Sequence, residues 1–347
     1  MDPTSPSFLV ISHSHHLLPW AWRLRSEGAN VKVVVVRKKY LSAWSGLLDK
    51  AVEVRKSRLS VEDLTKTPQW DGWLEQAKAG TLTILTDWQD LSDSLLEAGI
   101  PNLYAKRGVE RIEEGPPPLY LGAWLGPTGV AMPHIYVPDY GAWIGGQGPL
   151  VEGAGTLLRL EKPGPEALLA PFAETLSSAG FKGLFRVGLM FNEAAKEFAS
   201  VSVEAGWPFL HTHLFLAGVG LMPLLLANPQ AMALPKRVAV GIPVTVPPWP
   251  HQDGQKGSGE MRVEVSPEAR AHLFWHDMMT PDGGSFHTAN LDGLVAVAEG
   301  CSDNVAVARR RAVAVATSLA LPQRQVRTDA GAVVDGIWAG LEEMDWL

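Results

Sequence analysis

Short apolar runs and amphipathic stretches alternate along the first hundred residues. Residues 8–11 and 31–36 are apolar runs of strand length, and residues 17–27 between them have the longer pattern of a helix that stops at Gly28. A strand-like run at 82–85, a helical stretch at 91–98 and a strand at 100–104 continue this order. Strands that alternate with helices favour a parallel α/β sheet.

Beyond residue 118 the apolar runs become longer, after a short helix expected at 105–113. Strands are expected at 119–124, 130–137, 185–191, 198–203, 238–246 and 294–299, and helices at 164–179, 211–226 and 302–319. This pattern predicts three domains: an N-terminal parallel α/β domain at 1–112, a central α+β domain at 113–235 and a C-terminal α+β domain at 236–347.

Composition narrows the classes of function. The 347 residues are 46% hydrophobic and 19% charged, which suits a globular protein with substantial cores, and the formal net charge is −7. This charge does not indicate nucleic-acid binding, because neutralising phosphates usually needs a basic face. The single cysteine, Cys301, excludes an intrachain disulfide.

No membrane segment is predicted. The longest apolar stretch, 214–227, is interrupted by Gly218, Gly220 and Pro223 and is shorter than the roughly 20 residues that a membrane span requires. The N-terminus lacks the basic flank and apolar core of a signal peptide. We therefore expect a cytoplasmic protein.

Three histidines follow the first predicted strand, at His13, His15 and His16. In α/β sheets ligands bind at the carboxyl ends of strands, so this loop is well placed for a substrate contact. Two histidines at this spacing can also converge on a metal, but no nearby Asp, Glu or Cys completes a structural metal site. An ordinary polar loop is the third interpretation.

Two further segments carry candidate chemistry. The loop Gly145-Gly146-Gln147-Gly148 brings backbone N–H groups within reach of an anion, or is simply a tight turn. The turn Arg327-Thr328-Asp329-Ala330-Gly331 can hold a phosphate or a sugar hydroxyl through the guanidinium, or can be an internal salt-bridged turn.

Taken in chain order, these pieces resemble the phosphoribosylamine–glycine ligases (glycinamide ribonucleotide synthetases) of the ATP-grasp superfamily. Residues 9–11 with 21–24 look like the opening strand and helix of that family, and residues 98–113 look like the end of its N-terminal domain. The remaining matches are 138–141 with 145–148 to G-D-x-G…T-G-G-M-G, 183–190 to G-x-x-Y-x-G-L-M, and 327–331 to R-x-D-I-G.

The resemblance implies an ATP-grasp ligase-like scaffold, but two of the family's features are missing. The nucleotide-clamping lid is replaced by the six residues 113–118. In the segment E-x-N-x-R-x-G-D-P, Ser200 and Ser202 stand at the two metal-ligand positions, Glu204 replaces the Arg and Trp207 replaces the Asp. Mg²⁺ binds through carboxylates and substrate phosphates, so neither metal nor nucleotide cofactor is expected here.

The resemblance therefore implies a divergent member that has lost ordinary ATP-dependent ligation but keeps a pocket for a phosphoribosyl or amino-acid-like molecule. Its expected lining residues are His13, His15, Gly145, Gly146, Gln147, Gly148, Arg327 and Asp329. If catalysis survives, we expect transfer of an amine to an already activated acceptor, with no catalytic residue assigned. The alternatives are an active carbon–nitrogen ligase whose lid comes from a protein partner, and a non-catalytic interaction protein.

Overall fold

The structure is a computed structural model. It describes residues 5–13, 16–35, 44, 46–48, 52–53, 61–65, 72–104, 110–111, 117–126, 129–152, 154–160, 165–179, 181–192, 197–205, 212, 220–226, 237–250, 259–281, 284–289 and 291–347.

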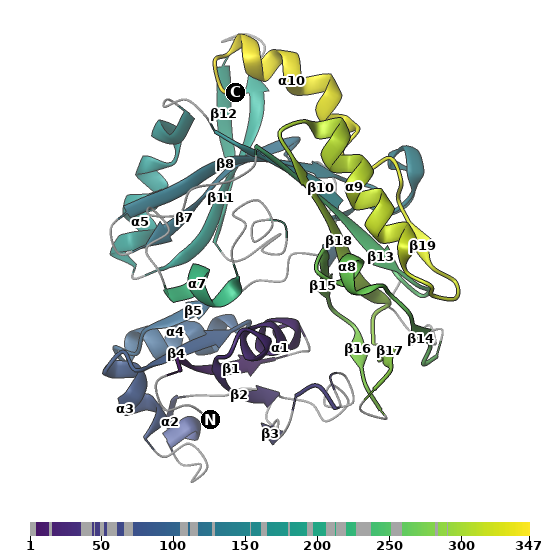
Figure 1. Cartoon of the computed structure of the whole chain (residues 1–347). Helices are drawn as coiled ribbons and strands as arrows, with labels where there is room; N and C mark the ends of the chain where they lie inside the picture. The colour runs from purple at the N-terminus through teal and green to yellow at the C-terminus, as the bar shows by residue number, and fades with distance from the viewer. Residues whose placement is uncertain are drawn as a thin grey trace.

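The N-terminal unit is a five-stranded, wholly parallel sheet with strand order β3-β2-β1-β4-β5 (Figure 1). Its strands are β1 (Ser7–Ser12), β2 (Asn30–Val35), β3 (Val52–Glu53), β4 (Leu82–Thr86) and β5 (Asn102–Tyr104). Its helices are α1 (Leu18–Ser26), α2 (Val61–Thr65), α3 (Trp73–Lys78) and α4 (Gln89–Glu97).

Both faces of this parallel sheet are covered, as its continuous apolar strands require. Phe8 and Val10 pack into the same core as Leu24 of α1, whereas Leu9 and Ile11 pack into a second core that includes buried residues of α2, α3 and α4. Successive side chains of a strand point to opposite faces, so one apolar run supplies both cores.

The rest of the chain is organised around a nine-stranded antiparallel sheet with order β12-β11-β7-β8-β10-β13-β18-β15, in which β19 also pairs with β13. These strands are β7 (Leu119–Gly126), β8 (Gly129–Asp139), β10 (Ala154–Arg159), β11 (Gly183–Asn192), β12 (Glu197–Ala205), β13 (Val238–Thr245), β15 (Leu273–Trp275), β18 (Leu294–Ser302) and β19 (Gln325–Val326). Because β10 pairs with β13, the predicted central and C-terminal domains share one sheet.

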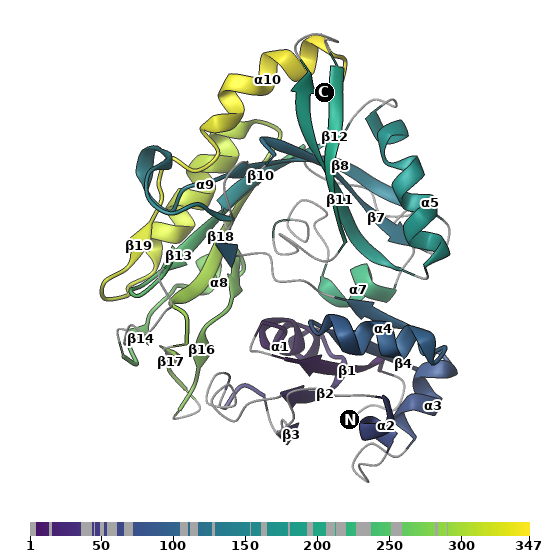
Figure 2. The same cartoon turned by 180° about the vertical axis from the view of Figure 1, so that it is seen from behind.

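Smaller elements surround this sheet. A three-stranded sheet has the order β14 (Arg262–Val263), β17 (Phe286–Thr288), β16 (Met278–Met279), and β6 (Glu110–Arg111) pairs with β9 (Val151–Glu152). The helices are α5 (Ala170–Ser178), α7 (Leu221–Leu226), α8 (Pro267–Arg270), α9 (Val305–Ser318) and α10 (Val333–Glu343), with short helical turns η3 (Ile144–Gly146) and η4 (Pro165–Leu168). Figures 1 and 2 show α9 and α10 on the side of the large sheet away from the N-terminal unit.

Helix α9 packs directly on β18 and β13 through small residues. Ala308, Ala312 and Ala316 are fully buried. A Cβ added to Gly300 of β18 would lie 2.1 Å from the Ala308 carbonyl oxygen, so helix and strand approach more closely than any side chain allows. Asn304 caps the helix, since its side chain accepts a hydrogen bond from the Val307 amide at 3.1 Å.

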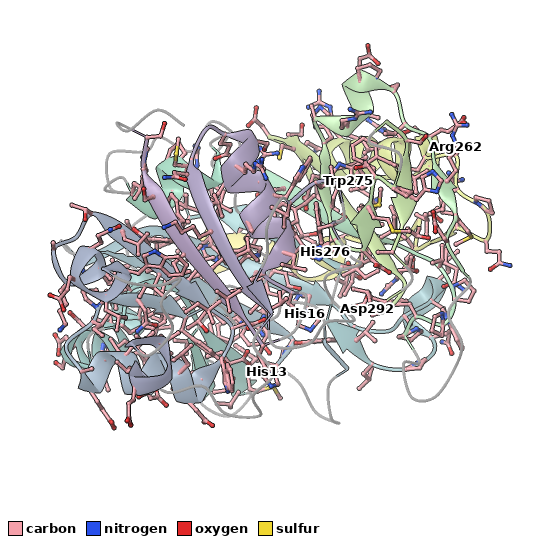
Figure 3. The ribbon with its side chains drawn as sticks, turned by 90° about the horizontal axis from the view of Figure 1, so that it is seen from below. His13, His16, Arg262, Trp275, His276 and Asp292 are labelled. Carbon is pink, nitrogen blue, oxygen red and sulfur yellow. The ribbon has the colours of Figure 1, made fainter. Side chains whose placement is uncertain are left out.

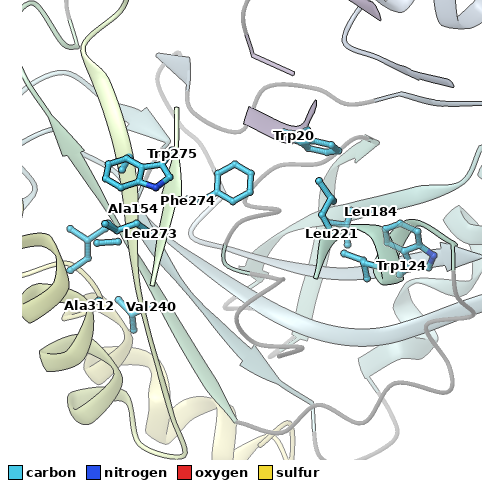
Figure 4. Packing of buried hydrophobic residues seen from close by; sticks show 14 of the residues in the cluster. Trp20, Trp124, Ala154, Leu184, Leu221, Val240, Leu273, Phe274, Trp275 and Ala312 are labelled. Atoms are coloured by element: carbon cyan, nitrogen blue, oxygen red, sulfur yellow. The ribbon is translucent and has the colours of Figure 1, made fainter. Parts of the chain in front are cut away.

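The main hydrophobic core runs from the N-terminal unit into the large sheet. Figure 4 shows Trp20 of α1, Leu221 of α7 and Phe274 of β15 around one interior region of this core. The N-terminal unit is also joined to the small sheet, because the Trp44 amide donates to the Met278 carbonyl oxygen at 2.7 Å. The two units are therefore packed against each other at more than one place.

Most of the predicted strands are confirmed, and two helix predictions are corrected. The helix expected at 105–113 is wrong at Glu110 and Arg111, which form a strand paired with β9. The helix expected at 164–179 is divided into η4 and α5, with Pro171 in the first turn of α5. Proline has no amide hydrogen and disfavours helical geometry in the residue before it, so it starts a helix rather than continuing one.

Other predictions are tested only in part. Of the helix expected at 211–226, α7 is observed at Leu221–Leu226, and residues 213–219 lie outside the described part of the chain. The sequence pattern does not predict β10. Among the described helices, none has the length and apolar character needed to cross a membrane.

Candidate functional site

The glycine-rich loop follows β8 and is shaped by glycines that no other residue type replaces easily. Gly141 and Gly148 have φ values of +99° and +83°. A Cβ at Gly148 would lie 2.7 Å from the Trp143 ring, and a Cβ at Gly141 would lie 2.5 Å from the Gly146 carbonyl oxygen. The loop therefore closes on itself and carries Trp143 at its surface.

Arg327, the residue after β19, holds this loop in place. Its Nη1 donates to the carbonyl oxygens of Asp139 at 3.3 Å, Tyr140 at 3.2 Å and Gly141 at 3.0 Å. Its Nη2 donates to Asp139 Oδ1 at 3.1 Å, and its Nε donates to Asp329 Oδ1 at 2.9 Å. Every nitrogen of the buried guanidinium thus has an acceptor within the chain.

Two carboxylates complete the connection. Asp329 Oδ2 accepts from the Gly145 amide at 2.8 Å, and the second oxygen of Asp139 accepts from the Gly331 amide. Burial acts to raise the pKa of Asp329, but hydrogen bonds from Arg327 and Gly145 outweigh it, so this pKa lies below its usual value. Burial raises the pKa of Asp139, although Gly331 and Arg327 act in the opposite direction.

The structure therefore brings together two segments that the sequence singled out separately. Gly145 and Asp329 are in direct contact, and Arg327 spans the base of the loop. Gly146, Gln147 and Gly148 are exposed on the same loop. In these contacts Arg327 and Asp329 position the loop.

A cavity of about 450 Å³ lies beside the loop and the Arg327 turn. Trp143 and Ile144 form its loop side, Trp249 and Thr245 line it from the end of β13 and the segment that follows, and Arg324 and Gln325 line it from β19 and the residue before it. This volume falls within the range of about 300–1,000 Å³ that is typical of ligand pockets.

Arg324 is the charged residue of this cavity that the sequence prediction missed. Its Nη1 donates to the carbonyl oxygens of Thr317 and Leu319 near the end of α9. Its Nε and Nη2 make no hydrogen bond within the described part of the chain, so one edge of the guanidinium remains available. Trp143, 52% exposed, adds an aromatic surface to the same cavity. Their nearness in sequence to Arg327 and to the glycine loop was the available signal.

The histidine loop lies elsewhere, at the carboxyl end of β1. The His13 amide donates to Asp87 Oδ1 at 2.6 Å, and Ser12 Oγ donates to Asp87 Oδ2 at 2.7 Å. The exposed His13 ring lies 4.9 Å from the Trp88 ring. His15 lies outside the described residues.

Figure 3 shows His13 and His16 at the border of the N-terminal unit, toward His276, which follows β15, and Asp292, which precedes β18. No described residue of the N-terminal unit lines the cavity beside the glycine loop. The structure therefore confirms the place of His13 at the carboxyl edge of the parallel sheet but does not bring it to Arg327.

The strand pair β11 and β12, where the sequence analysis expects the family's metal ligands to be lost, contains an ion pair. Arg186 donates to Glu204 Oε2 from Nη2 at 2.6 Å and from Nε at 3.1 Å, and its guanidinium lies 4.0 Å from the centre of the Tyr120 ring. Ser202 packs against Gly188, and Ser200 is exposed. Within the described ranges, no group of three or more His, Cys, Asp or Glu side chains is arranged to hold a metal ion.

Comparison with known proteins gives a clear result only at the level of structure. No family model matches the sequence, and no curated protein sequence matches it. Phosphoribosylamine–glycine ligase of Thermotoga maritima superposes with a TM-score of 0.51 at 14% identity, covering 93% of this chain and 99% of that chain.

Carboxylases are similar to the same extent. The biotin carboxylase domain of a single-chain bacterial carboxylase has a TM-score of 0.51 at 11% identity, covering 98% of this chain and 99% of that chain. Kluyveromyces lactis urea carboxylase has a TM-score of 0.56 at 12% identity. The superposition covers 98% of this chain and 32% of that longer protein. These likenesses, together with the parallel sheet and the large antiparallel sheet, show that the chain has an ATP-grasp-type fold.

Proposed function

We propose that this chain is a divergent relative of the phosphoribosylamine–glycine ligases that binds a small anionic molecule and no longer carries out ordinary ATP- and Mg²⁺-dependent ligation. The observation that carries the proposal is the Arg327–Asp329 turn, which fixes the glycine loop beside an open cavity of about 450 Å³. The loop and the turn are the two substrate-side motifs of the resemblance.

The ion pair between Arg186 and Glu204 supports the proposed loss of metal. Mg²⁺ binds hard oxygen ligands, usually carboxylates together with substrate phosphates. The carboxylate of Glu204 is already paired with a guanidinium, and positions 200 and 202 carry only serine hydroxyls. A metal entering here would have to displace Arg186, whose side chain is almost completely buried.

The short connection between β6 and β7 supports the proposed loss of the lid. Only residues 112–118 separate these strands. The proposed division into units at 1–112, 113–235 and 236–347 follows from the sequence pattern, and the last two units share the large sheet. Neither ATP nor a metal is proposed as a cofactor.

The proposed ligand is a phosphoribosyl or amino-acid-like molecule. The available edge of Arg324 offers two N–H directions to a phosphate or carboxylate, the geometry that guanidinium groups use for such anions. Gly145, Gly146, Gln147 and Gly148 remain proposed contacts because they directly follow the lining residues Trp143 and Ile144 on the same loop. His13 does not line this cavity, so His13 and His15 are proposed as contacts only for a part of the ligand that extends beyond it toward the N-terminal unit. Arg327 and Asp329 hold the loop in place.

If the chain is catalytic, the proposed reaction joins an amine to an acyl phosphate. The amine nitrogen attacks the acyl carbon, the carbon–nitrogen bond forms and the bond to the phosphate oxygen breaks. Phosphate leaves with the bonding electron pair, and the amine proton is released to solvent. The acceptor arrives already activated, so the reaction does not require ATP.

Isothermal titration calorimetry with ribose 5-phosphate, glycine and ATP plus Mg²⁺ tests this proposal. We expect ribose 5-phosphate or glycine to bind without ATP, and Arg324→Ala to weaken binding of the phosphate at least tenfold. Arg310→Ala removes the same charge from an exposed position on α9 and serves as the matched control.

Two results would overturn the proposal. Tight, Mg²⁺-dependent binding of ATP would instead support an active ligase whose lid comes from a partner. Absence of binding by all three compounds would support a non-catalytic interaction protein.

A further inference from the structure

A second cavity, of about 500 Å³, lies between the N-terminal unit and the large sheet. It is bordered by the first residues of β4 and β5, by the end of β7 and by the last turn of α7. Because β1 and β4 are parallel, this edge is opposite to the one that carries His13. No residue that lines the cavity beside the glycine loop also lines this one.

The floor of the second cavity is apolar. Leu82, Leu103, Trp124 and Leu125 line it, and each is at most 7% exposed in the structure. Leu226 stands at its rim with 47% of its surface exposed, which is unusual for a leucine next to a core. A hydrocarbon chain or ring lying on this floor would be shielded from water, which is favourable because apolar surface is removed from water on binding.

The rim of the second cavity is cationic. Lys182, just before β11, makes no hydrogen bond or ion pair within the described part of the chain, and Lys78 forms only an exposed pair with Glu75 at 3.3 Å. No Asp or Glu is present among the described lining residues. The cavity thus combines an apolar floor with ammonium groups that lack a buried counter-ion.

One wall of the cavity is held in place from the N-terminal unit. Glu27, which follows α1, accepts from the Leu221 amide at 2.9 Å and from the Met222 amide at 2.7 Å, the first two residues of α7. Arg23 Nε in turn donates to Glu27 Oε1 at 2.6 Å. These contacts fix the first turn of α7, and the last residue of α7 is Leu226. This wall of the cavity is therefore already formed before a ligand binds.

We propose that this cavity is a binding site for a small amphipathic carboxylate, separate from the ligase-like site. The hydrocarbon part lies on the leucine and tryptophan floor, and the carboxylate pairs with Lys182. The combination favours this ligand over neutral apolar molecules, which form no ion pair with the exposed Lys182, and over short polar anions, which bury none of the apolar floor.

Calorimetric titration of the full chain with octanoate, octan-1-ol and acetate tests this inference. We expect octanoate to bind, acetate to bind undetectably, and octan-1-ol to bind at least tenfold more weakly than octanoate. Lys182→Met keeps the length of the side chain and removes its charge, so it should weaken octanoate binding about tenfold without changing the affinity for octan-1-ol. Arg310→Met is the matched control and should change neither.

A second variant tests the wall. Glu27→Gln removes the charge that holds α7 but touches no ligand atom, so it should weaken octanoate and octan-1-ol by the same factor. Equal affinities for octanoate and octan-1-ol, an unchanged octanoate affinity in Lys182→Met, or no binding of octanoate would each overturn the inference. Arg324→Ala, which tests the ligase-like site, should leave octanoate binding unchanged.

Discussion

Arg327 shows how one side chain can join distant parts of the chain. Its guanidinium reaches three consecutive carbonyl oxygens and the carboxylate of Asp139, partners that lie more than 180 positions earlier in sequence. Both Arg327 and Asp139 are at most 9% exposed, so each charge depends on the other for its solvation. Removing one partner of such a pair leaves the other buried without compensation.

Arg327→Ala should lower the free energy of unfolding by about 3–5 kcal/mol, the range found when one partner of a buried ion pair is removed. Arg324→Ala is the matched control, and its effect should be below about 1 kcal/mol because Arg324 is only partly buried and forms no ion pair within the described residues. Urea unfolding followed by circular dichroism measures both. Equal effects of the two substitutions would contradict the assigned role of Arg327.

His134 of β8 gives the molecule a residue that responds to pH. It is buried, its Nδ1 donates to the Met132 carbonyl oxygen at 3.0 Å, and burial lowers its pKa to about 4 although that hydrogen bond acts in the opposite direction. The unfolded chain binds a proton at this residue near pH 6.5, whereas the folded chain does not until about pH 4. The stability that this residue supports is therefore complete above pH 6.5 and falls with pH down to about 4.

His134→Gln should remove this part of the pH dependence. Relative to the variant, the wild-type free energy of unfolding should fall by about 3 kcal/mol between pH 7 and pH 4, at 1.36 kcal/mol for each pH unit over which the two states differ by one proton. Urea unfolding midpoints of both proteins across this pH range provide the measurement. Parallel curves for the two proteins would show that His134 is not the group responsible.

At the scale of elements, Gly300 and Gly336 differ in the space available for a side chain. Gly300 of β18 lies against α9, where a Cβ would be 2.1 Å from the Ala308 carbonyl oxygen and 2.5 Å from the Ala312 amide nitrogen. Gly336 lies within α10, and a Cβ there would meet no atom within 4 Å. Close packing of β18 on α9 leaves no room for a side chain at Gly300. At Gly336 there is room, and the glycine there only increases the backbone entropy of the unfolded chain.

Gly300→Ala should therefore destabilise the protein by about 1–3 kcal/mol, as overpacking in a core does, because helix and strand have to separate. Gly336→Ala should stabilise it by about 0.5–1 kcal/mol, since alanine loses less backbone entropy in a helix. Thermal unfolding of the two variants gives the comparison. The same direction of change in both would argue against close packing of α9 on β18.

At the scale of the whole molecule, a short segment joins the N-terminal unit to the small sheet. The Trp44 amide donates to Met278, and Gly46 has a φ of +76° with its α-carbon against Thr280. A Cβ at Gly46 would lie 2.3 Å from the Thr280 carbonyl oxygen. Gly80 has a similar φ of +73° but no atom within 4 Å of an added Cβ.

Gly46→Ala and Gly80→Ala should each lower the free energy of unfolding by about 1 kcal/mol through backbone strain. Only Gly46→Ala should also weaken the contact between the units. Hydrogen exchange at the Trp44 amide measures this contact. We expect exchange to be at least tenfold faster in Gly46→Ala and unchanged in Gly80→Ala. Unchanged exchange in Gly46→Ala would show that the segment does not join the units.

The extent to which the fold could be predicted follows from the range of the interactions involved. The alternation of β1, α1 and β2 was predicted from about thirty residues, because the spacing of apolar residues in each element depends only on residues close together in the chain. The pairing of Glu110 and Arg111 with β9 was not, since their sequence is compatible with a helix and the partner strand lies 40 positions away. The fold resemblance succeeded because several short motifs occur in one order.

The candidate site divides in the same way. The sequence identified the glycine loop and the Arg327 turn as segments of special chemistry, but not that Asp329 contacts Gly145 or that Arg327 has no donor to spare. Arg324 was missed although it lies three residues before Arg327, because no local pattern shows which of its guanidinium nitrogens are hydrogen-bonded. The Nε and Nη2 edge of Arg324 is available because only Nη1 donates to the carbonyl oxygens near the end of α9, and that contact depends on where α9 ends in the folded chain.

By itself, the sequence determined most of the strands, the parallel α/β order of the N-terminal unit, and the positions where glycine or proline constrains the backbone. These properties depend on contacts between residues near one another in the chain. Only the tertiary structure decided which charges are used internally and which are left for a ligand. Whether a guanidinium is saturated depends on carbonyl and carboxylate groups that folding brings together from distant positions, and no local pattern records them.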